Sequence, residues 1–492
     1  MSSYFIGVDI GTTSTKAIAF SSEGHIISHH NIGYPISHPE PEQSEQDPDE
    51  ILKAVIETIQ QVQNEARTQG TLEGVSFSAA MHSLMAVDVQ GKPLTQLIIW
   101  ADNRAGAVAD RLKAAPEGME IYQATGTPIH AMSPLCKLLW LREHNPDLFK
   151  QTHKFIGIKE YIFFRLVGKY VIDHSLASAT GLFDIHTLDW NKQALQKIQL
   201  PVEKLSTLVD IFHIEHCSSE WAEKLTIPDR TPFVIGASDG CLANVGTGAL
   251  TPDQVSITVG TSGAVRIGIP KPWTDSKMQT FCYVLTPELF IAGGGMNNGG
   301  IIAEWLHKNL FPDIEEGDFT TLITKALSVP AGSDGLLFLP YLLGERAPVY
   351  NAHAKGVYFG ITIQHTQAHF IRAAFEGIAL AIYHTGRALL DQFPEINTLY
   401  VGGGFARSKE WVQLLADVYG KPIAITDTVE SSGYGAVLVG RYALKTLRSW
   451  RLVPADKSSQ VFEPNSSNHQ LYQQVFDQYC KLYNTLSPQF FS

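Results

Sequence analysis

One short pattern occurs twice in this chain of 492 residues, and it constrains the fold more than any other feature. Residues 6–20, I-G-V-D-I-G-T-T-S-T-K-A-I-A-F, form an apolar run, a turn of glycine and hydroxyl residues, and a second apolar run. Residues 255–269, V-S-I-T-V-G-T-S-G-A-V-R-I-G-I, have the same layout. Repetition of one supersecondary unit predicts two related domains, which we place at residues 1–245 and 246–492. Chance recurrence of a short strand–glycine–strand unit stays open on this evidence alone.

The pattern around the first copy predicts an α/β fold. A third apolar run begins at Ile26 after the turn signal at residues 22–24, so three short strands would form an antiparallel meander. Asp47-Pro48 is typical of a helix start, and apolar residues at helical spacing follow it. Residues 74–80 predict another strand, and strands and helices alternate onward to about residue 245.

The charge balance and the apolar pattern exclude several classes of partner. Lys and Arg number 37 against 49 Asp and Glu, giving a formal charge of −12. Nucleic acids and anionic membranes need basic surfaces, so we expect neither, and we expect a small-molecule substrate. No apolar stretch reaches about 20 residues, so no membrane span is predicted. The five cysteines are scattered and the N-terminus lacks a secretory pattern, which favours the cytoplasm.

The turn after the first strand has the composition of a phosphate site. Residues 11–14, G-T-T-S, can offer backbone N–H groups and hydroxyls to phosphate oxygens. Asp9 would hold the hydrated Mg²⁺ that accompanies a nucleotide, and Lys16 could add positive charge. The turn at residues 260–263, G-T-S-G, offers the same chemistry, and two such turns favour a two-sided clamp. An ordinary hairpin turn is the alternative for each.

A third glycine site lies at residues 402–404. A strand ends at Val401, and a helix is predicted to begin near Ser408. A helix N-terminus after a glycine turn attracts anions or polar ligand edges. A tight strand-to-helix turn without a ligand is the better reading of this segment taken alone.

Two longer segments carry a resemblance to a known family. Residues 132–144, M-S-P-L-C-K-L-L-W-L-R-E-H, include Pro134, Lys137 and Trp140. Residues 356–376 run from G-V-Y-F-G to Glu376. In this order they resemble the two signatures of the FGGY family of carbohydrate kinases, and D-I-G-T-T-S-T-K resembles its N-terminal phosphate motif. Without the resemblance, both segments predict amphipathic helices with a loop.

The resemblance implies a fold of two actin-, hexokinase- and Hsp70-like (ribonuclease H-like) domains with central mixed sheets. ATP would lie in the cleft between them, with Mg²⁺ as its companion. The family's catalytic base is an Asp near the end of the first domain, and the segment V-I-G-A-S-D-G-C makes Asp239 the candidate for this base. Asp239 is also a candidate ligand of Mg²⁺. Phosphoryl transfer to an alcohol needs such a proton acceptor, although an Asp turn or helix cap is the structural alternative.

The expected nucleotide site combines the turn residues with positions that match the family. It comprises Gly11, Thr12, Thr13, Ser14, Lys16, Gly260, Thr261, Gly300, Glu304, Gly403, Gly404 and Ser408. Ser408 stands where some members of the family carry Asn.

The expected substrate site follows two apolar runs of the first domain. It comprises Met81, His82, Trp100, Asp102 and Arg104, together with Asp239. The segments F-S-A-A-M-H-S-L, W-A-D-N-R-A and G-G-G-M-N-N-G-G are similar to the gluconokinase branch of the family. This similarity favours D-gluconate, whose carboxylate Arg104 could bind bidentately while His82 and Asp102 bond hydroxyls. A salt bridge between Arg104 and Asp102 is the competing interpretation.

Two other functions stay open at this point. A kinase for D-xylulose or another ketopentose is the nearest alternative. An ATP-binding scaffold of the actin or Hsp70 type is the alternative from a different class, and the predicted base argues against it. The oligomeric state is open, with a homodimer as one option.

Overall fold

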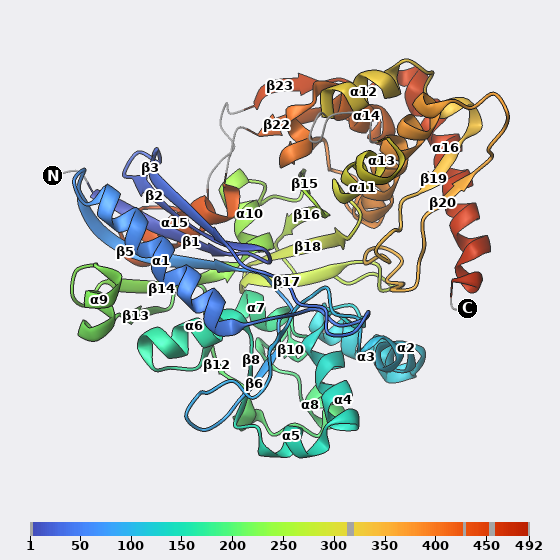
Figure 1. Cartoon of the computed structure of the whole chain (residues 1–492). Helices are drawn as coiled ribbons and strands as arrows, with labels where there is room; N and C mark the ends of the chain where they lie inside the picture. The colour runs from blue at the N-terminus through green and yellow to red at the C-terminus, as the bar shows by residue number, and fades with distance from the viewer. Residues whose placement is uncertain (1–2, 312–318, 427–429, 452–457, 491–492) are drawn as a thin grey trace.

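The computed structural model describes residues 3–311, 319–426, 430–451 and 458–490. It contains two large mixed sheets, each covered by helices (Figure 1). The blue and green elements of the first half form one lobe with an extension below it. Apart from α15 (Ser431–Ala443), the yellow and red elements of the second half form the other lobe. The expected α/β architecture of two sheet-centred lobes is therefore confirmed.

The first sheet has six strands in the order β13-β14-β5-β1-β2-β3. Its strands are β1 (Ser3–Ile10), β2 (Ser14–Ser21), β3 (Ile26–Gly33), β5 (Thr71–Ala79), β13 (Ile214–His216) and β14 (Pro232–Ser238). The first three strands form the predicted antiparallel meander. β5 lies parallel to both β1 and β14, so the carboxyl ends of these three strands meet at one edge.

The second sheet has seven strands in the order β17-β18-β16-β15-β21-β22-β23. Its strands are β15 (Gln254–Val259), β16 (Gly263–Ile269), β17 (Phe281–Thr286), β18 (Leu289–Met296), β21 (Thr398–Gly402), β22 (Ile423–Thr426) and β23 (Ser458–Phe462). β15, β16 and β18 repeat the meander of β1, β2 and β3, and β21 and β22 add parallel strands as β5 and β14 do. The repeat read from the sequence is a repeat of topology.

The helices surround these sheets. The long or central ones are α1 (Pro48–Ala66), α4 (Pro134–His144), α6 (Ile158–Val167), α10 (Asp239–Thr247), α11 (Ile301–Leu310), α12 (Phe319–Leu327), α13 (Gln367–Gln392), α14 (Lys409–Tyr419), α15 (Ser431–Ala443) and α16 (Ser466–Leu486). The others are α2 (Gly106–Ala114), α3 (Pro116–Thr125), α5 (Pro146–Gln151), α7 (His174–Ser178), α8 (Lys192–Ile198) and α9 (Ser219–Leu225). None of the helices in the described part of the chain combines the length and apolarity that crossing a membrane requires.

Short strands complete the extension below the first lobe and the edge of the second. They are β4 (Glu45–Gln46), β6 (Met85–Val87), β7 (Leu97–Ile98), β8 (Lys154–Ile156), β9 (Val171–Asp173), β10 (Phe183–Asp184), β11 (Asp189–Trp190), β12 (Thr207–Val209), β19 (Leu337–Leu339) and β20 (Val357–Phe359). The segment 132–144 contains the helix α4, whose N-terminal part is buried and whose C-terminal end is exposed. The segment 356–376 contains β20 and the start of α13.

Local chemistry explains the first helix. The side chain of Asp47 accepts a hydrogen bond from the backbone N–H of Asp49, and Pro48 occupies the first turn. Ile51, Val55, Ile59 and Val62 are buried, as their helical spacing predicts, and α1 covers the first sheet through this face. The cap and the apolar stripe act together to fix where α1 begins and which side faces the core.

One helix of the second half belongs by its contacts to the first sheet. α15 packs on β1, β5 and β14 and runs against α10 (Figure 1). Gly246 of α10 and Gly435 of α15 lie at this crossing, where an added Cβ at either position would come within 2.2 Å of backbone atoms of the other helix. The division at residues 245 and 246 therefore stays a prediction, because the polypeptide returns to the first lobe near its end.

Candidate active site

Three parallel strands deliver the expected site residues to one edge of the first sheet. β1 ends before the turn at Gly11 and Thr12, β5 ends before Met81, and β14 ends directly before Asp239. In α/β proteins the carboxyl ends of parallel strands are where ligand-binding residues gather. The distant segments of the sequence thus meet because their strands are neighbours.

A cavity of about 290 Å³, here called the central cavity, lies between the two sheets. Its lining from the first half includes Thr12, Met81, His82, Trp100, Met132 and Asp239. Its lining from the second half includes Gly260, Ser262, Arg266, Phe281, Tyr283, Gly295, Arg346 and Tyr350. Four of the expected substrate residues, Met81, His82, Trp100 and Asp239, therefore share one space.

Asp239 is the first residue of α10, and one of its carboxylate oxygens accepts a hydrogen bond from the N–H of Gly240 at 2.6 Å. Burial raises the pKa of Asp239 to about 6, and the negative charge of Asp9 adds to the increase. A carboxyl with this pKa is largely ionised at neutral pH and can still accept a proton. This is the behaviour required of a general base.

Buried polar groups hold the end of β14 in place behind Asp239. Lys159 donates to the carbonyls of Ile235 and Ala237 at 3.0 Å and forms an ion pair with Asp173 at 2.7 Å. Asp173 in turn accepts from the hydroxyl of Ser175, whose oxygen accepts the N–H of Ser238 at 2.7 Å. The strand end that carries Asp239 is thereby fixed from behind.

His82 has a positive φ of 67°, and its ring is fixed from two sides. Its Nδ1 donates to the carbonyl of Ala179 at 2.8 Å, while the hydroxyl of Tyr283 lies 3.3 Å from Nε2. Burial, with the nearby charge of Lys137, lowers the pKa of His82 to about 3, so the ring is neutral. Lys137 donates to the carbonyl of His82 at 2.6 Å and of Ile99 at 2.8 Å, tying two substrate segments together.

Trp100 connects the first phosphate turn with the second half of the chain. Its Nε1 donates to the hydroxyl of Thr12 at 2.8 Å, and the guanidinium of Arg346 lies 4.5 Å from the centre of a Trp100 ring. Arg346 donates from Nε to the side chain of Asn297 at 2.8 Å and from Nη2 to the carbonyl of Met296 at 3.0 Å. The two halves therefore contact each other across the cavity.

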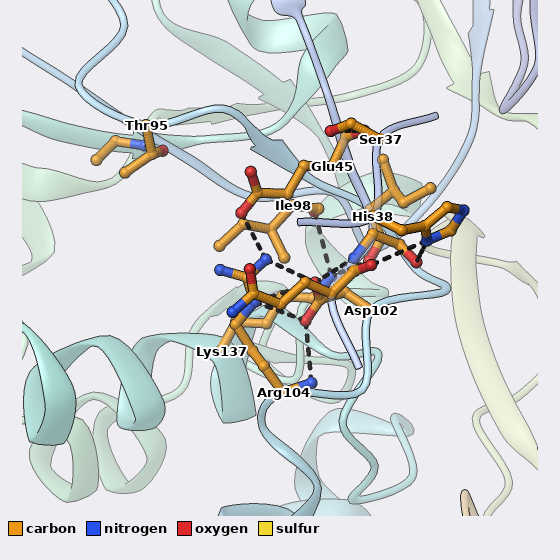
Figure 2. Close-up of polar contacts among 12 residues, drawn as sticks. Ser37, His38, Glu45, Thr95, Ile98, Asp102, Arg104 and Lys137 are labelled. Carbon is orange, nitrogen blue, oxygen red and sulfur yellow. Dashed lines mark hydrogen bonds and ion pairs between the residues drawn. The ribbon is translucent and has the colours of Figure 1, made fainter. Parts of the chain in front are cut away.

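Arg104 and Asp102 do not lie where the sequence interpretation put them. Arg104 donates from Nε and Nη2 to Asp102, at 2.8–3.0 Å, and from Nη2 to Glu45 at 2.5 Å. Figure 2 shows both carboxylates turned toward the guanidinium. Asp102 is fully buried and also accepts the N–H of Ser44 at 2.7 Å, and neither Asp102 nor Arg104 lines the central cavity. The guanidinium of Arg104 is occupied by carboxylates of the protein itself, which argues against the expectation that it binds a substrate carboxylate.

A second, larger cavity of about 700 Å³, here called the outer cavity, gathers half of the expected nucleotide residues. It is lined by Gly260, Thr261, Gly300, Glu304, Gly404 and Ser408, with Ile323, Phe405, Arg407 and Glu410 among the others. Gly260 lines both cavities, so the turn after β15 stands where they meet. A nucleotide in the outer cavity would direct its phosphates toward this turn.

The glycine turn after β21 has a steric reason for its composition. Gly403 has a φ of 89°, and a Cβ there would lie 2.4 Å from the carbonyl oxygen of Val259. A Cβ on Gly404, by contrast, would meet nothing within 4 Å. Ser408 caps α14 by accepting the N–H of Trp411 at 3.3 Å. Gly403 therefore shapes the turn, while Gly404 and Ser408 border the cavity.

The first phosphate turn is well defined, but its lysine is engaged elsewhere. The N–H of Gly11 donates to the carbonyl of Ser14 at 3.0 Å, closing the turn, and Thr13 is exposed at its tip. Lys16 forms an ion pair with Glu430 at 2.6 Å and lines neither cavity. The expectation that Lys16 supplies charge to a nucleotide stays a prediction, and the carboxylate partner of its ammonium argues against it.

Asp9 has the chemistry that a hydrated Mg²⁺ ion requires. Its two carboxylate oxygens accept hydrogen bonds from the hydroxyls of Ser78 and Ser432, each at 2.7 Å. In the described parts of the chain no group of three or more His, Cys, Asp or Glu side chains forms a closed metal site. Asp9 and Asp239 offer oxygen ligands alone, which fits an ion that keeps several waters and binds phosphate oxygens.

The sequence interpretation missed several residues that line the central cavity, among them Arg266 and Tyr283. Arg266 is the charged residue in the otherwise apolar run A-V-R-I-G-I, and this break in the pattern could have revealed it. Tyr283 lies on a fully buried strand with no distinguishing pattern, so nothing local marks it. Arg346, in the loop between β19 and β20, also lines the cavity.

Comparison with known proteins accounts for this arrangement. Residues 4–246 match the model of the N-terminal domain of the FGGY family of carbohydrate kinases, and residues 255–444 match that of its C-terminal domain. The chain belongs to the FGGY family of carbohydrate kinases. As a member of this family it is a kinase that uses ATP and acts on a small molecule.

Individual relatives of this FGGY kinase carry two different names. It is 43% identical to the gluconokinase of Bacillus subtilis strain 168, over 92% of this chain and 90% of that protein. The crystal structure of a gluconate kinase from Lactobacillus acidophilus superposes with a TM-score of 0.94, at 34% identity and full coverage of both chains. The structure of a ligand-bound xylulose kinase from the same organism superposes with a TM-score of 0.95, also at 34% identity and full coverage.

Proposed function

We propose that this kinase is a gluconokinase, which converts D-gluconate and ATP to 6-phospho-D-gluconate and ADP. The position of Asp239 carries the catalytic part of the proposal. It lies in the central cavity, at the N-terminus of α10, near the turn shared with the outer cavity. An alcohol held in the central cavity would stand between this base and the phosphates of a nucleotide in the outer cavity.

The proposed reaction uses Asp239 as general base. The terminal hydroxyl of the substrate donates its proton to the carboxylate of Asp239, and its oxygen attacks the γ-phosphorus of ATP. The bond between the γ-phosphorus and the bridging oxygen breaks, and ADP leaves. Backbone N–H groups of the turns at residues 11–14 and 260–263 would stabilise the negative charge on the phosphates.

Asp9 and Asp239 would hold Mg²⁺, which supplies charge neutralisation to the phosphates of ATP when it is bound. Asp9 is oriented for this by the hydroxyls of Ser78 and Ser432. A cation there would also offset the repulsion between the two carboxylates, which contributes to the raised pKa of Asp239.

The choice of gluconate rests on the relative of highest identity described above and on the lining of the central cavity. The protein named gluconokinase is 43% identical to this chain, and two guanidinium groups line the cavity. A ketopentose kinase is the second candidate, because one equally similar structure is that of a protein named xylulose kinase. We further propose a cytoplasmic location, in keeping with five free thiols, and a homodimer is one option for the assembly.

A coupled assay of ADP release tests the proposed function. The purified protein is incubated with ATP and Mg²⁺ and, in turn, D-gluconate, D-xylulose, D-ribulose, glycerol and other aldonates. We expect kcat/KM for D-gluconate to exceed that for every neutral sugar by at least tenfold. A higher kcat/KM for a ketopentose would assign the protein to the second candidate function.

A further inference from the structure

Arg266 lies in the central cavity with part of its guanidinium unpaired. Its Nε and Nη1 atoms are shielded from solvent and have no hydrogen-bond partner among the residues that the structure describes. The flanking residues Val265 and Ile267 are buried apolar side chains on β16. Shielded donors of a cation that lack a partner are unfavourable, so a site that keeps them is expected to receive a negative ligand.

Two glycines leave room around this guanidinium. A Cβ on Gly240, next to Asp239, would lie 3.0 Å from Nε and 3.1 Å from Nη2 of Arg266. On the other side, Arg266 is opposite Gly293 of β18, which is in turn opposite Phe281 of β17. The guanidinium therefore packs against the base-bearing helix, and its neighbour on β18 contributes no side chain, while its neighbour on β15 is Ser256.

The charges around the central cavity favour an anion. Arg266 and Arg346 are its basic residues and Asp239 is its acidic one, while His82 is neutral. Glu345, adjacent to Arg346, does not line the cavity and accepts hydrogen bonds from the N–H groups of Asn297 and Arg346. With Asp239 ionised, the lining keeps an excess positive charge that a neutral sugar would leave unpaired.

The two basic residues are not equivalent. Arg346 already donates to Asn297 and Met296 and stacks on Trp100, so its position is fixed by the protein. Arg266 has two donors that still need an acceptor. A carboxylate is negatively charged and offers two acceptor oxygens to guanidinium N–H groups, whereas a sugar hydroxyl is neutral and offers one.

We propose that Arg266 binds the carboxylate of the sugar-acid substrate and is the residue by which this kinase selects an aldonate over a neutral sugar. The inference rests on the proposed function, since it requires an acidic substrate. It replaces Arg104, whose guanidinium is held by Asp102 and Glu45.

The test compares one acidic and one neutral ligand of the same chain length. D-gluconate and D-glucitol differ in having a carboxylate or a hydroxymethyl group at C1. Dissociation constants for both are measured by calorimetry, and kcat/KM by ADP release, for the wild type and for Arg266→Met and Arg266→Lys. Arg407→Met is the matched control, because it removes an arginine from the outer cavity instead.

We expect Arg266→Met to lower kcat/KM for D-gluconate by about 10- to 100-fold, the range of a charge-assisted hydrogen bond. Binding of D-glucitol and KM for ATP should change less than threefold, and Arg266→Lys should restore part of the loss. Arg407→Met should instead raise KM for ATP and leave the ratio of the two sugar affinities unchanged. Thermal unfolding shows that each variant is folded.

Three results would overturn the inference, and the first two leave the proposed function standing. If the wild type prefers an aldonate but Arg266→Met keeps that preference, Arg266 is not the selecting residue, and the proposed function stands. If KM for ATP rises as much as KM for D-gluconate, Arg266 binds phosphate. A wild type that prefers neutral sugars refutes both statements. A preference for an aldonate other than gluconate refutes only the proposed substrate, and the same variants are then assayed with that acid.

Discussion

Two arginines show how different two regions of one molecule can be. In the region around Asp102, Arg104 meets two carboxylates, and Asp102 in turn has its oxygens bonded to Arg104 and Ser44 (Figure 2). In the central cavity, Arg266 keeps unpaired donors beside Asp239. In the first region, the guanidinium has its acceptors without a ligand. In the second region, the donors of Arg266 gain acceptors when an anion binds.

The difference teaches that a charged residue near a site is a candidate ligand only if its hydrogen-bonding capacity is still available. Arg104 follows Trp100 closely in the sequence and resembles a substrate residue for that reason. Its role in the structure is to fix the segment that places Trp100 in the cavity. Removing it should therefore affect stability, and changes in the central cavity should affect catalysis.

The largest expected effect is on catalysis, from Asp239→Asn. The amide keeps the shape but cannot accept the proton of the substrate, so kcat should fall by about 10²- to 10⁴-fold, the usual contribution of a general base. Calorimetry should show nearly unchanged binding of ADP in the outer cavity. A kcat within fivefold of the wild type would remove Asp239 from the catalytic role.

The next effect is on stability, from Arg104→Met. Loss of the guanidinium leaves Asp102, which is fully buried, without its cation, and this should destabilise the first lobe by about 3–5 kcal/mol. Thermal unfolding measures the loss, and kinetics below the transition should show KM for D-gluconate within about threefold of the wild type. Normal stability with a much raised KM would return Arg104 to the substrate site.

A third effect concerns pH. Because the pKa of Asp239 is raised to about 6, the base becomes protonated as the pH falls through this value. We expect kcat/KM to decrease about tenfold per pH unit below it. Arg266 lowers the pKa of Asp239, so Arg266→Met should move this acid limb to higher pH. Profiles of kcat/KM against pH, recorded at fixed ATP and Mg²⁺, check this shift. An equal shift of the acid limb in Arg104→Met would contradict the contrast between the two arginines.

The smallest expected effect is a gain in stability from Arg266→Met. Replacing a guanidinium that has unpaired buried donors with an apolar side chain should raise the free energy of unfolding by about 1 kcal/mol in the absence of ligand. Differential scanning calorimetry would detect the increase in Tm. Saturating D-gluconate should then stabilise the wild type more than the variant, and a destabilised variant would show that Arg266 has a structural role.

Much of the framework could be predicted because its signals are local. The meander at residues 3–33 follows from short apolar runs separated by turns, and α1 follows from its cap and its apolar stripe. Asp239 and the glycine turns were found through the family resemblance, which preserves motifs within short segments. The environment of Lys16 could not be found this way, because its partner Glu430 lies 414 residues away.

The sequence by itself determined the α/β class and the family, and it predicted the repeat and the positions of the base and the phosphate turns. These depend on patterns within about 20 residues, where hydrophobic periodicity and turn chemistry act. Only the tertiary structure decided which arginine has free donors. Arg104 finds Glu45 across 59 residues, and Arg266 lies beside Asp239 because the two sheets face each other. Pairing of charges is set by distance in space, and the spacing of residues along a chain does not contain that distance.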